Sequence, residues 1–365
     1  MKFLIVLVSL LVFSTSSNAA VVLFKDSNTP EQNTEAWNDA MSRTKEFDVL
    51  AIPRGEFYHN GLVIDGKQHL QISTVIPGQT QGARLISVNT SQPSIIIARS
   101  RNIELSGLYF GHASTSAQAA IAFYNTGNFT VDKVSTWQET AKYSPANSMH
   151  GIVVHADAGA FGWIYITNSI FNSHPGDGIY LSATHETAIL AELYLNDNVI
   201  MNNAGNGISV IDRIAGLYFS RNTMWDNGIA IRLISATDIF LNNNIIDWSR
   251  SFNILATDTT SGHLKSNWIS WAQADANIQI TGQGNAFAPW EISDNTILTS
   301  NGHGIVYGMG EARIHNNTFK GQAGTGITLT ENSKDVSVIM NYFKGHSLLV
   351  NDFGTNNQIL MNPTF

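Results

Sequence analysis

Residues 195–208 read LNDNVIMNNAGNGI, and residues 219–231 repeat the same order of residue types as FSRNTMWDNGIAI. Each stretch begins with an apolar residue, has an asparagine three positions later and an apolar residue two beyond that, and then a polar turn with Gly-Ile. A period of about 24 residues built from short apolar strands is typical of a solenoid. The asparagines of this repeat, 22 to 30 residues apart, are Asn168, Asn198, Asn222, Asn244, Asn267, Asn295, Asn317 and Asn341.

The pattern predicts an all-β right-handed parallel β-helix with three strands per coil and about ten coils, over residues 20–365. The leucine-rich consensus of other solenoids with this period is absent, and no stretch after residue 100 keeps an apolar period of 3.6. Stacked coils lie about 4.8 Å apart, so we expect the asparagines to form a buried, hydrogen-bonded ladder. A second marker opens one strand of each coil at Gly151-Ile152, Gly178-Ile179, Gly207-Ile208, Gly228-Ile229, Asn253-Ile254, Asn277-Ile278, Gly304-Ile305 and Gly326-Ile327.

The N-terminal region carries two features of another kind. Residues 1–19 have a lysine, an apolar run and small residues before a cut after Ala19, which predicts a signal peptide and a secreted or periplasmic protein. In residues 31–45, apolar side chains fall on one helical face, which predicts a helix that caps the first coil. That face holds Ala36, Trp37, Ala40 and Met41.

The composition excludes several classes of protein. The 365 residues include 20 Lys and Arg against 28 Asp and Glu, a net charge of −8, and charged residues make up only 13% of the chain. We therefore expect no nucleic-acid partner and, in the mature form, no membrane. No cysteine is present, which excludes disulfides, thiolate metal sites and cysteine nucleophiles. No pattern predicts an oligomeric state.

A short helix, the phrase Ile52-Pro53-Arg54-Gly55-Glu56-Phe57-Tyr58 and the Asn and Gly-Ile coils resemble the pectate-lyase superfamily of right-handed β-helices. The resemblance covers residues 21–365. That superfamily includes polysaccharide lyases, polygalacturonase-type hydrolases, uronate epimerases and phage depolymerases, so the resemblance implies an extracellular polysaccharide as the partner. No catalytic motif of these families matches in full. Gly302-His303-Gly304 matches a polygalacturonase phrase, but Phe252 and Ala276 stand where its aspartates should be.

Candidate site residues cluster on the coils between residues 150 and 232. Extra residues lengthen the coils at 136–149, 156–162 and 183–192, as the walls of a cleft would, and four of the 11 histidines lie between residues 150 and 185. Alignment on the Gly-Ile marker places the polar side chains on one outward face. The catalytic candidates are His150, His155, Asp177, Tyr180 and Arg232; the substrate-binding candidates are His174, His185, Asp212 and Arg213.

These residue types suit β-elimination or C5 epimerisation of a uronic-acid polymer. A cation neutralises the carboxylate so that the C5 proton becomes acidic, a base removes that proton, and an acid protonates the leaving oxygen. We expect His150 or His155 as the base, Tyr180 as the acid and Arg232 or Arg213 as the cation. No cofactor is certain; Ca²⁺ could replace the arginine, with Asp157 and Asp177 as oxygen ligands.

Two alternatives stay open. An inverting hydrolase needs two carboxyl groups roughly 6.5–9.5 Å apart, which Asp177 could form with Asp212 or Asp226. A non-catalytic glycan-binding or surface structural β-helix could stack sugars on its tryptophans, which recur at the coil turns from Trp137 to Trp290.

Overall fold

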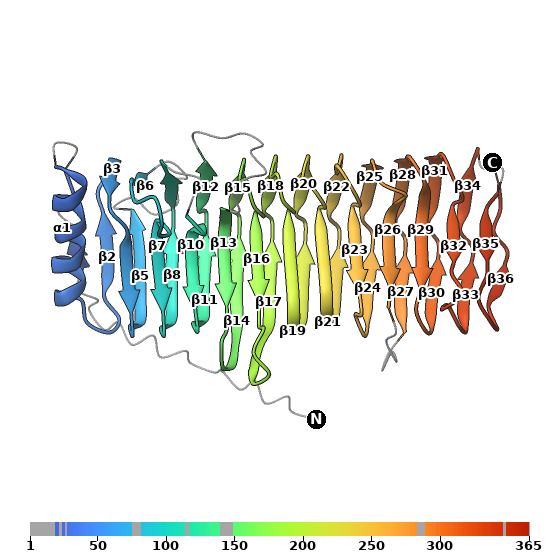
Figure 1. Cartoon of the computed structure of the whole chain (residues 1–365), viewed down its shortest axis with the longest axis horizontal. Helices are drawn as coiled ribbons and strands as arrows, with labels where there is room; N and C mark the ends of the chain where they lie inside the picture. The colour runs from blue at the N-terminus through green and yellow to red at the C-terminus, as the bar shows by residue number, and fades with distance from the viewer. Residues whose placement is uncertain are drawn as a thin grey trace, which may run out of the picture.

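The computed structural model describes residues 19–21, 24–25, 28–74, 82–113, 117–138, 149–282, 289–345 and 348–364. Within them the chain winds into a parallel β-helix with three strands per coil, and the coils stack in chain order from the N-terminal helix to the last strand (Figure 1). The described part has a 12-stranded sheet with one strand per coil, where the sequence predicted about ten coils.

We name the three columns of strands PB1, PB2 and PB3 in the order in which each coil passes through them. PB1 holds β4 (Leu62–Asp65), β7 (Ile95–Ala98), β10 (Ala119–Tyr124), β13 (His150–His155), β16 (Ile179–Ser182), the first parts of β19 (Ile208–Ser220) and β21 (Ile231–Asn242), β23 (Ile254–Thr257), β26 (Ala276–Thr281), β29 (His303–Gly308), β32 (Ile327–Leu329) and β35 (Val350–Asp352).

PB2 joins PB1 in one 24-stranded sheet, because β19 and β21 run through both columns. It holds β1 (Ala19–Val21), β2 (Val49–Ile52), β5 (Gln68–Thr74), β8 (Arg101–Ser106), β11 (Gly127–Asp132), β14 (Gly159–Thr167), β17 (Ala188–Asn196), the second parts of β19 and β21, β24 (Gly262–Lys265), β27 (Trp290–Ser293), β30 (Ala312–His315), β33 (Val336–Ile339) and β36 (Gln358–Leu360).

PB3 is the separate 12-stranded sheet. It holds β3 (Gly55–His59), β6 (Ala83–Ser87), β9 (Leu108–His112), β12 (Ser135–Gln138), β15 (Ile170–Asn172), β18 (Val199–Met201), β20 (Thr223–Trp225), β22 (Ile245–Asp247), β25 (Trp268–Ala272), β28 (Thr296–Ser300), β31 (Thr318–Gln322) and β34 (Tyr342–Lys344).

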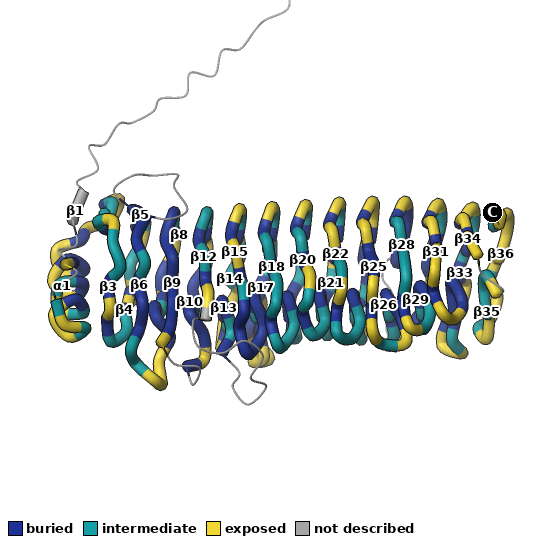
Figure 2. Tube along the Cα trace, turned by 90° about the horizontal axis from the view of Figure 1, so that it is seen from above, coloured by how far each residue is buried: buried dark blue, intermediate teal, exposed yellow. Residues whose placement is uncertain are grey.

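The core is a set of apolar columns that run along the helix axis. Inward and outward side chains alternate along each strand, so buried and exposed stretches repeat from coil to coil (Figure 2). One PB1 column is made almost wholly of isoleucine, because each coil places the same position at the same depth. Its fully buried members are Ile152, Ile179, Ile208, Ile231, Ile254, Ile278, Ile305 and Ile327.

The strand register shows that one predicted Gly-Ile marker, Gly228-Ile229, was placed two residues too early. Ile231, not Ile229, pairs with Ile208, so Ala230 takes the place that glycine holds at Gly207. The pairing also moves Arg232, which the sequence alignment put in the column of His155. In the structure Arg232 pairs with Ser209, and Ser209 pairs with Tyr180.

The asparagine ladder follows the corner between PB2 and PB3. Each asparagine donates from its side-chain amide to a carbonyl of the preceding coil and to the asparagine of the next: Asn222 Nδ2 lies 2.7 Å from Leu195 O and 3.0 Å from Asn244 Oδ1. Asn168 is not a member. It is exposed, and Ser169 is buried in the ladder position, where its N–H donates to Asn198 Oδ1.

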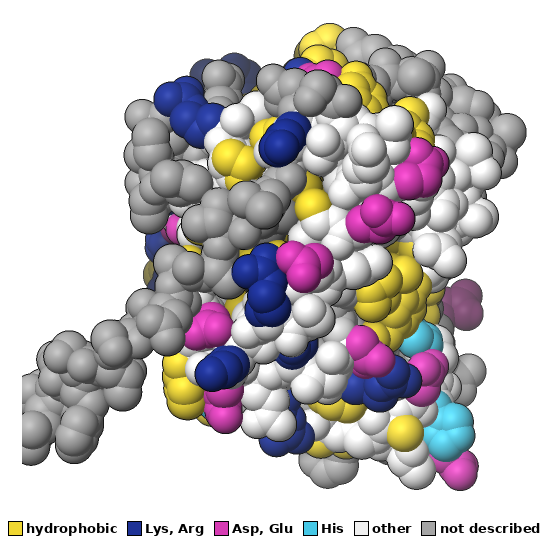
Figure 3. Space-filling model, turned by 90° about the vertical axis from the view of Figure 1, so that its left-hand side faces the viewer, with side chains coloured by type: hydrophobic (Ala, Val, Ile, Leu, Met, Phe, Trp, Pro, Cys, Tyr) yellow, Lys and Arg dark blue, Asp and Glu magenta, His cyan; other side chains and the backbone are white. Residues whose placement is uncertain are grey.

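Helix α1 (Pro30–Arg43) caps the first coil, as predicted for residues 31–45. Thr29 begins it with a capping box to Gln32, and the Trp37 indole is fully buried and donates to Val63 O. Seen from this end, basic and acidic side chains intermingle on the surface (Figure 3).

The predicted signal peptide falls on residues of which all but Ala19 lie outside the described ones. Among the described residues, no helix is long and apolar enough to cross a membrane.

Two of the predicted insertions lengthen strands. Residues 156–162 and 183–192 extend β14 and β17 at their N-terminal ends, where Gly159 pairs with Ala188, and both strands reach beyond their neighbours (Figure 1). Most of the third insertion, residues 139–148, lies outside the described residues.

Candidate functional site

His150, Asp177 and Tyr180 meet at the start of two neighbouring PB1 strands, β13 and β16. The Asp177 backbone N–H donates to His150 Nδ1 at 2.9 Å, and its Oδ2 lies 3.7 Å from the same nitrogen. The His150 ring stacks on Tyr180, with ring centroids 4.8 Å apart. Asp177 Oδ1 accepts from the Asn206 N–H of the next coil at 2.5 Å. The structure thus brings these three predicted residues together.

Burial keeps both rings of this stack neutral. It lowers the pKa of His150, with Asp177 acting in the opposite direction. It also raises the pKa of the Tyr180 phenol, to which the charge of Asp177 adds. Because Nδ1 of His150 accepts a backbone N–H, the neutral ring carries its proton on Nε2. His150 can therefore donate a hydrogen bond from Nε2 but has no free lone pair for a base.

A second cluster lies at the other end of the same strands. His155 Nε2 is 2.6 Å from Asp157 Oδ1, and His155 Nδ1 is 2.7 Å from Ser182 Oγ. A carboxylate only accepts, so Nε2 donates to Asp157 and Nδ1 accepts from the Ser182 hydroxyl. The Ser182 side chain, two residues further along the same strand, also lowers the pKa of the Tyr180 phenol, against the larger effect of burial. Ser182 thus lies between Tyr180 and His155.

Ser182 was not among the sequence-derived candidates. It stood in the column of His155, but a serine on a strand carries no signal of its own. Only the hydrogen bonds between coils give it a role.

The remaining polar candidates of this face lie one or two coils further along. Arg232 stands two coils from Tyr180, roughly 10 Å along the axis, and its charge lowers the pKa of the phenol, whereas Asp212 raises it. Asp212 and Arg213 both have positive φ at an irregularity within β19. The Arg213 guanidinium donates to the carbonyl of Glu186 in the extension before β17.

The structure places the other two histidines, His174 and His185, away from the outward face of PB1 that holds His150 and Tyr180. His174 is fully buried at the corner between PB3 and PB1, with Nε2 2.8 Å from Thr136 Oγ1, and burial lowers its pKa to about 3. It has no surface to offer a substrate, so we leave it out of the proposed site. His185 is an exposed turn residue whose Nδ1 lies 2.9 Å from Thr187 Oγ1.

The proposed calcium ligands are too far apart to share an ion. Asp177 lies beside His150 at the start of β13, and Asp157 follows the end of that strand, roughly 16 Å away. Ca²⁺ ligands lie 2.3–2.6 Å from the ion, so this pair is wrong as a joint site. The described residues contain no group of three or more His, Asp or Glu that could hold a metal ion.

The sequence and fold place the chain among known proteins in two ways. Residues 165–364 match the family described as periplasmic copper-binding protein (NosD), and because they make up more than half of the chain, it belongs to that family. A comparison with curated proteins found no match.

The fold is that of right-handed β-helix proteins that act on polysaccharides, as the resemblance to the pectate-lyase superfamily implied. An alginate lyase from Paenibacillus sp. is 12% identical with a TM-score of 0.51, covering 88% of this chain and 97% of that one. A family 28 exopolygalacturonase from Yersinia enterocolitica is also 12% identical, with a TM-score of 0.52 and coverage of 95% and 79%.

An α-1,3-glucanase from Streptomyces thermodiastaticus gives a TM-score of 0.54 at 12% identity, covering 96% of this chain and 68% of that one. At such low identities these likenesses extend to the fold alone.

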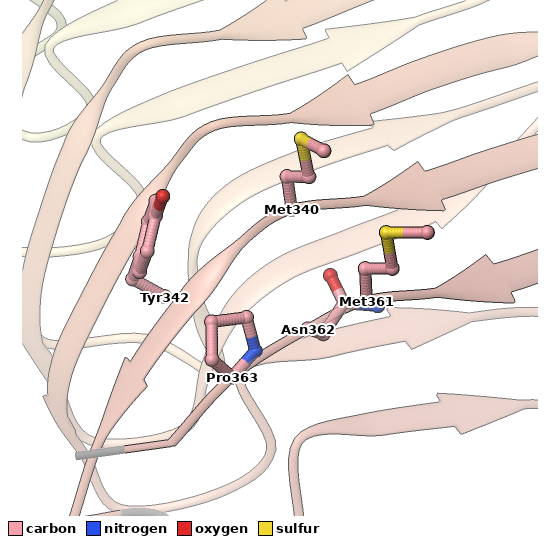
Figure 4. A pocket seen from close by; sticks show the side chains of 5 residues that line it. All are labelled: Met340, Tyr342, Met361, Asn362 and Pro363. Atoms are coloured by element: carbon pink, nitrogen blue, oxygen red, sulfur yellow. The ribbon is translucent and has the colours of Figure 1, made fainter.

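A hollow on the surface lies at the last coil, away from the candidate site. Met340, Tyr342, Met361, Asn362 and Pro363 line it, and the two methionine side chains lie on neighbouring turns (Figure 4). None of these five side chains is ionised at neutral pH, so the charged chemistry of the molecule is concentrated elsewhere.

Proposed function

We propose that the protein acts on a uronic-acid polysaccharide along PB1, by β-elimination or C5 epimerisation. The observation that carries the proposal is the Tyr180 phenol, which is stacked on His150, lies two residues from Ser182 on the same strand and is within the electrostatic influence of Arg232. Proton donors on β13 and β16 and a cation on β21 thus share the outward face of PB1. The β-helix neighbours with polysaccharide substrates add support for this class of ligand.

In this proposal Tyr180, expected from the sequence as the acid, also serves as the base, and neither His150 nor His155 removes the C5 proton itself. The phenol can pass its proton through Ser182 to Nδ1 of His155, whose ring is held by Asp157. The phenolate oxygen then takes the C5 proton, and the electrons move to the uronate carboxylate. Arg232 and the Nε2–H of His150 stabilise the charge that develops there.

The two reactions diverge after that step. In elimination the C4–O bond breaks as the C4–C5 double bond forms, and the phenol returns its proton to the leaving oxygen. In epimerisation the C4–O bond stays, the phenol keeps the abstracted proton, and C5 takes a proton from water on the opposite face. Epimerisation therefore leaves a solvent hydrogen on C5, whereas elimination leaves none there and is seen as the unsaturated product.

Hydrolysis is less well supported by the carboxylates. Asp226 Oδ1 lies 3.3 Å from the Arg250 guanidinium, and Asp177 accepts the Asn206 N–H and is almost fully buried. An inverting hydrolase needs two carboxyl groups that face the substrate, whereas these two are already engaged by other groups of the chain.

The family description also names copper, and the described residues do not fit it. The chain has no cysteine, and no three histidine or carboxylate side chains of the described part gather into a ligand set. Met340 and Met361 offer two soft sulfur atoms, but His315, which lines a second hollow together with Met340, has its Nε2 3.5 Å from the Glu291 carboxylate. We derive no step through copper.

The test is deuterium exchange at C5, together with the ultraviolet absorbance of unsaturated uronate, in polymannuronate, polyguluronate and polygalacturonate. We expect one of the three to show either exchange, as an epimerase gives, or a rise in absorbance, as a lyase gives. We expect a fall of roughly 10²–10⁴-fold in kcat for Tyr180→Phe. The matched control is Tyr218→Phe on PB2, whose ring stacks on Phe240 in the next coil; it should keep full activity. New reducing ends without exchange and without the absorbance of unsaturated uronate would favour a hydrolase, and binding without any product would favour a glycan-binding protein.

A further inference from the structure

Three exposed tryptophans gather on PB3, around β22 and β25, on a different face from His150 and Tyr180. Trp248, Trp268 and Trp271 are 54%, 48% and 53% exposed. Tryptophan is strongly buried on average in folded proteins, and a cluster of large apolar side chains on a surface marks an interaction site. Trp248 and Trp271 stack on neighbouring coils with ring centroids 5.6 Å apart.

The backbone at this position does not favour tryptophan. Trp248 and Trp271 have φ of 53° and 56°, in the left-handed region that bulky residues avoid. The three preceding coils place Ser173, Asn202 and Asp226 in the same conformation, and Asn and Asp adopt it readily. A tryptophan at this position in two neighbouring coils therefore lowers the free energy of unfolding. Burial does not fully compensate, because about half of each side chain stays exposed to water. Strain of this kind concentrates at binding sites.

A polar pair lies between the rings. In chain order Ser270 stands between Trp268 and Trp271, and it pairs across the strands with Asp247. Ser270 Oγ donates to Asp247 Oδ1 at 2.6 Å, and the Trp268 indole donates to Ser270 Oγ at 3.3 Å. Asp247 is half-buried and negatively charged. Indole faces beside a carboxylate acceptor suit a ligand with apolar C–H faces and many hydroxyl donors.

The Ser270–Asp247 pair beside the tryptophans disfavours other ligands at this surface. A lipid surface would have to bury the Asp247 charge, and an acidic polymer would be repelled by it. A second copy of the chain is disfavoured by area. The half-exposed tryptophans offer roughly 100 Å² each, so that three of them together cover less than half of the ~800 Å² per partner of a stable interface. The coil spacing of about 4.8 Å is close to the length of one pyranose unit.

We propose that Trp248, Trp268, Trp271 and Asp247 form a binding site for a neutral glycan chain, separate from the PB1 face. Successive pyranose units stack on the indole rings, and the Asp247 carboxylate accepts hydrogen bonds from their hydroxyl groups. The inference requires no catalysis, and it holds or fails independently of the reaction proposed for Tyr180.

The test is isothermal titration calorimetry of the full chain with neutral hexasaccharides of glucose, mannose, galactose and N-acetylglucosamine, and with hexamannuronate. The double variant Trp248→Asn/Trp271→Asn places at both sites the residue found at Asn202. We expect it to lose at least tenfold in affinity for a neutral hexasaccharide while its Tm stays within a few degrees. The matched control is Trp163→Asn, since Trp163 is 53% exposed with φ of 56° but lies on PB2.

Other results would overturn the proposal. These are no binding of any neutral hexasaccharide, equal affinity in the double variant, or tighter binding of hexamannuronate that the double variant loses. Sedimentation of the wild type as a dimer that the double variant disperses would assign the tryptophans to a second copy. Co-sedimentation with phosphatidylcholine–phosphatidylglycerol vesicles, lost in the double variant, would assign them to a membrane.

Discussion

The two corners of PB3 have similar polar residues but differ in continuity. At the PB2–PB3 corner, Asn198 begins an unbroken run of asparagines that passes through Asn222 and ends at Asn362. At the PB3–PB1 corner the run is interrupted. It passes from Asn203 to Asn227, with His174 before it and Ser249 after it, and a second pair, Asn253 and Asn277, follows.

Buried polar atoms without a partner are more frequent at the interrupted corner. Among the described residues, His174 Nδ1, Ser249 Oγ, Asn253 Oδ1 and Gln322 Oε1 lie at the PB3–PB1 corner without a hydrogen-bond partner, against Asn196 Oδ1 and Ser293 Oγ beside the continuous ladder. The PB3–PB1 corner leads into His150 and Asp177, and it carries Trp248 and Trp271. A ladder that repeats without change leaves no position free for other chemistry, whereas an interrupted one does. The proposed sites lie next to the interrupted corner.

The largest effect expected is the loss of one member of the continuous ladder. Asn222→Ala removes the acceptor of the Asn198 backbone and side-chain amides and the donor to Leu195 O. We expect a loss of about 3–5 kcal/mol in the free energy of unfolding, measured by guanidinium denaturation. Asn227→Ala, at the end of the short run, should cost about half as much. Equal costs would mean that continuity adds nothing.

The buried histidines should make stability depend on pH. Burial lowers the pKa of His59 and of His174 to about 3, below the ordinary value of 6.5. As the pH falls below 6.5, only the unfolded state binds these protons, so stability decreases down to about pH 3. Each histidine contributes a slope of about 1.4 kcal/mol per pH unit.

His174→Asn isolates the contribution of one histidine, because asparagine is the residue of the next two coils at this corner. We expect the variant to fold and to lose half of the slope that the two histidines add, as seen in denaturation curves between pH 4 and pH 6. An unchanged slope would show that His174 accepts a proton in the folded state.

The smallest effect expected comes from repairing the interruption. Ser249→Asn supplies an amide next to Asn227 in place of a hydroxyl that has no partner. We expect a gain of about 1 kcal/mol in the free energy of unfolding, measured by the same denaturation. A loss of stability would show that the corner at Ser249 is too tightly packed for an amide, so that packing and not hydrogen bonding ended the run.

Much of the fold could be predicted from the sequence because each coil repeats the same physical requirements. The isoleucine columns, the ladder from Asn198 onward and the helix with Trp37 followed from spacing alone. The alignment of the coils was wrong by one or two residues where another residue type takes the place of the usual one. Ser169 holds the asparagine position and Ala230 holds the glycine position. The alignment chose Asn168 and Gly228 instead, because these neighbours have the expected residue type.

The candidate site was less predictable than the fold. The sequence brought His150, Asp177 and Tyr180 together correctly, because they flank a regular Gly-Ile marker. It placed Arg232 in the wrong column, since the alignment shifted by two residues at Gly228. It treated His174 as a surface residue, although its position in the coil is the one that Asn203 fills in the next.

The sequence by itself determined that this chain is a parallel β-helix with a helical cap, because a short period of apolar and asparagine residues can bury its side chains only by stacking. The tertiary structure alone decided which polar residues touch. Contacts between coils typically join residues more than 20 positions apart, so a single inserted residue shifts the partners of every later residue in its coil. The hydrogen bonds between Ser182 and His155, and the strained stack of Trp248 on Trp271, exist only because the backbone register sets them side by side.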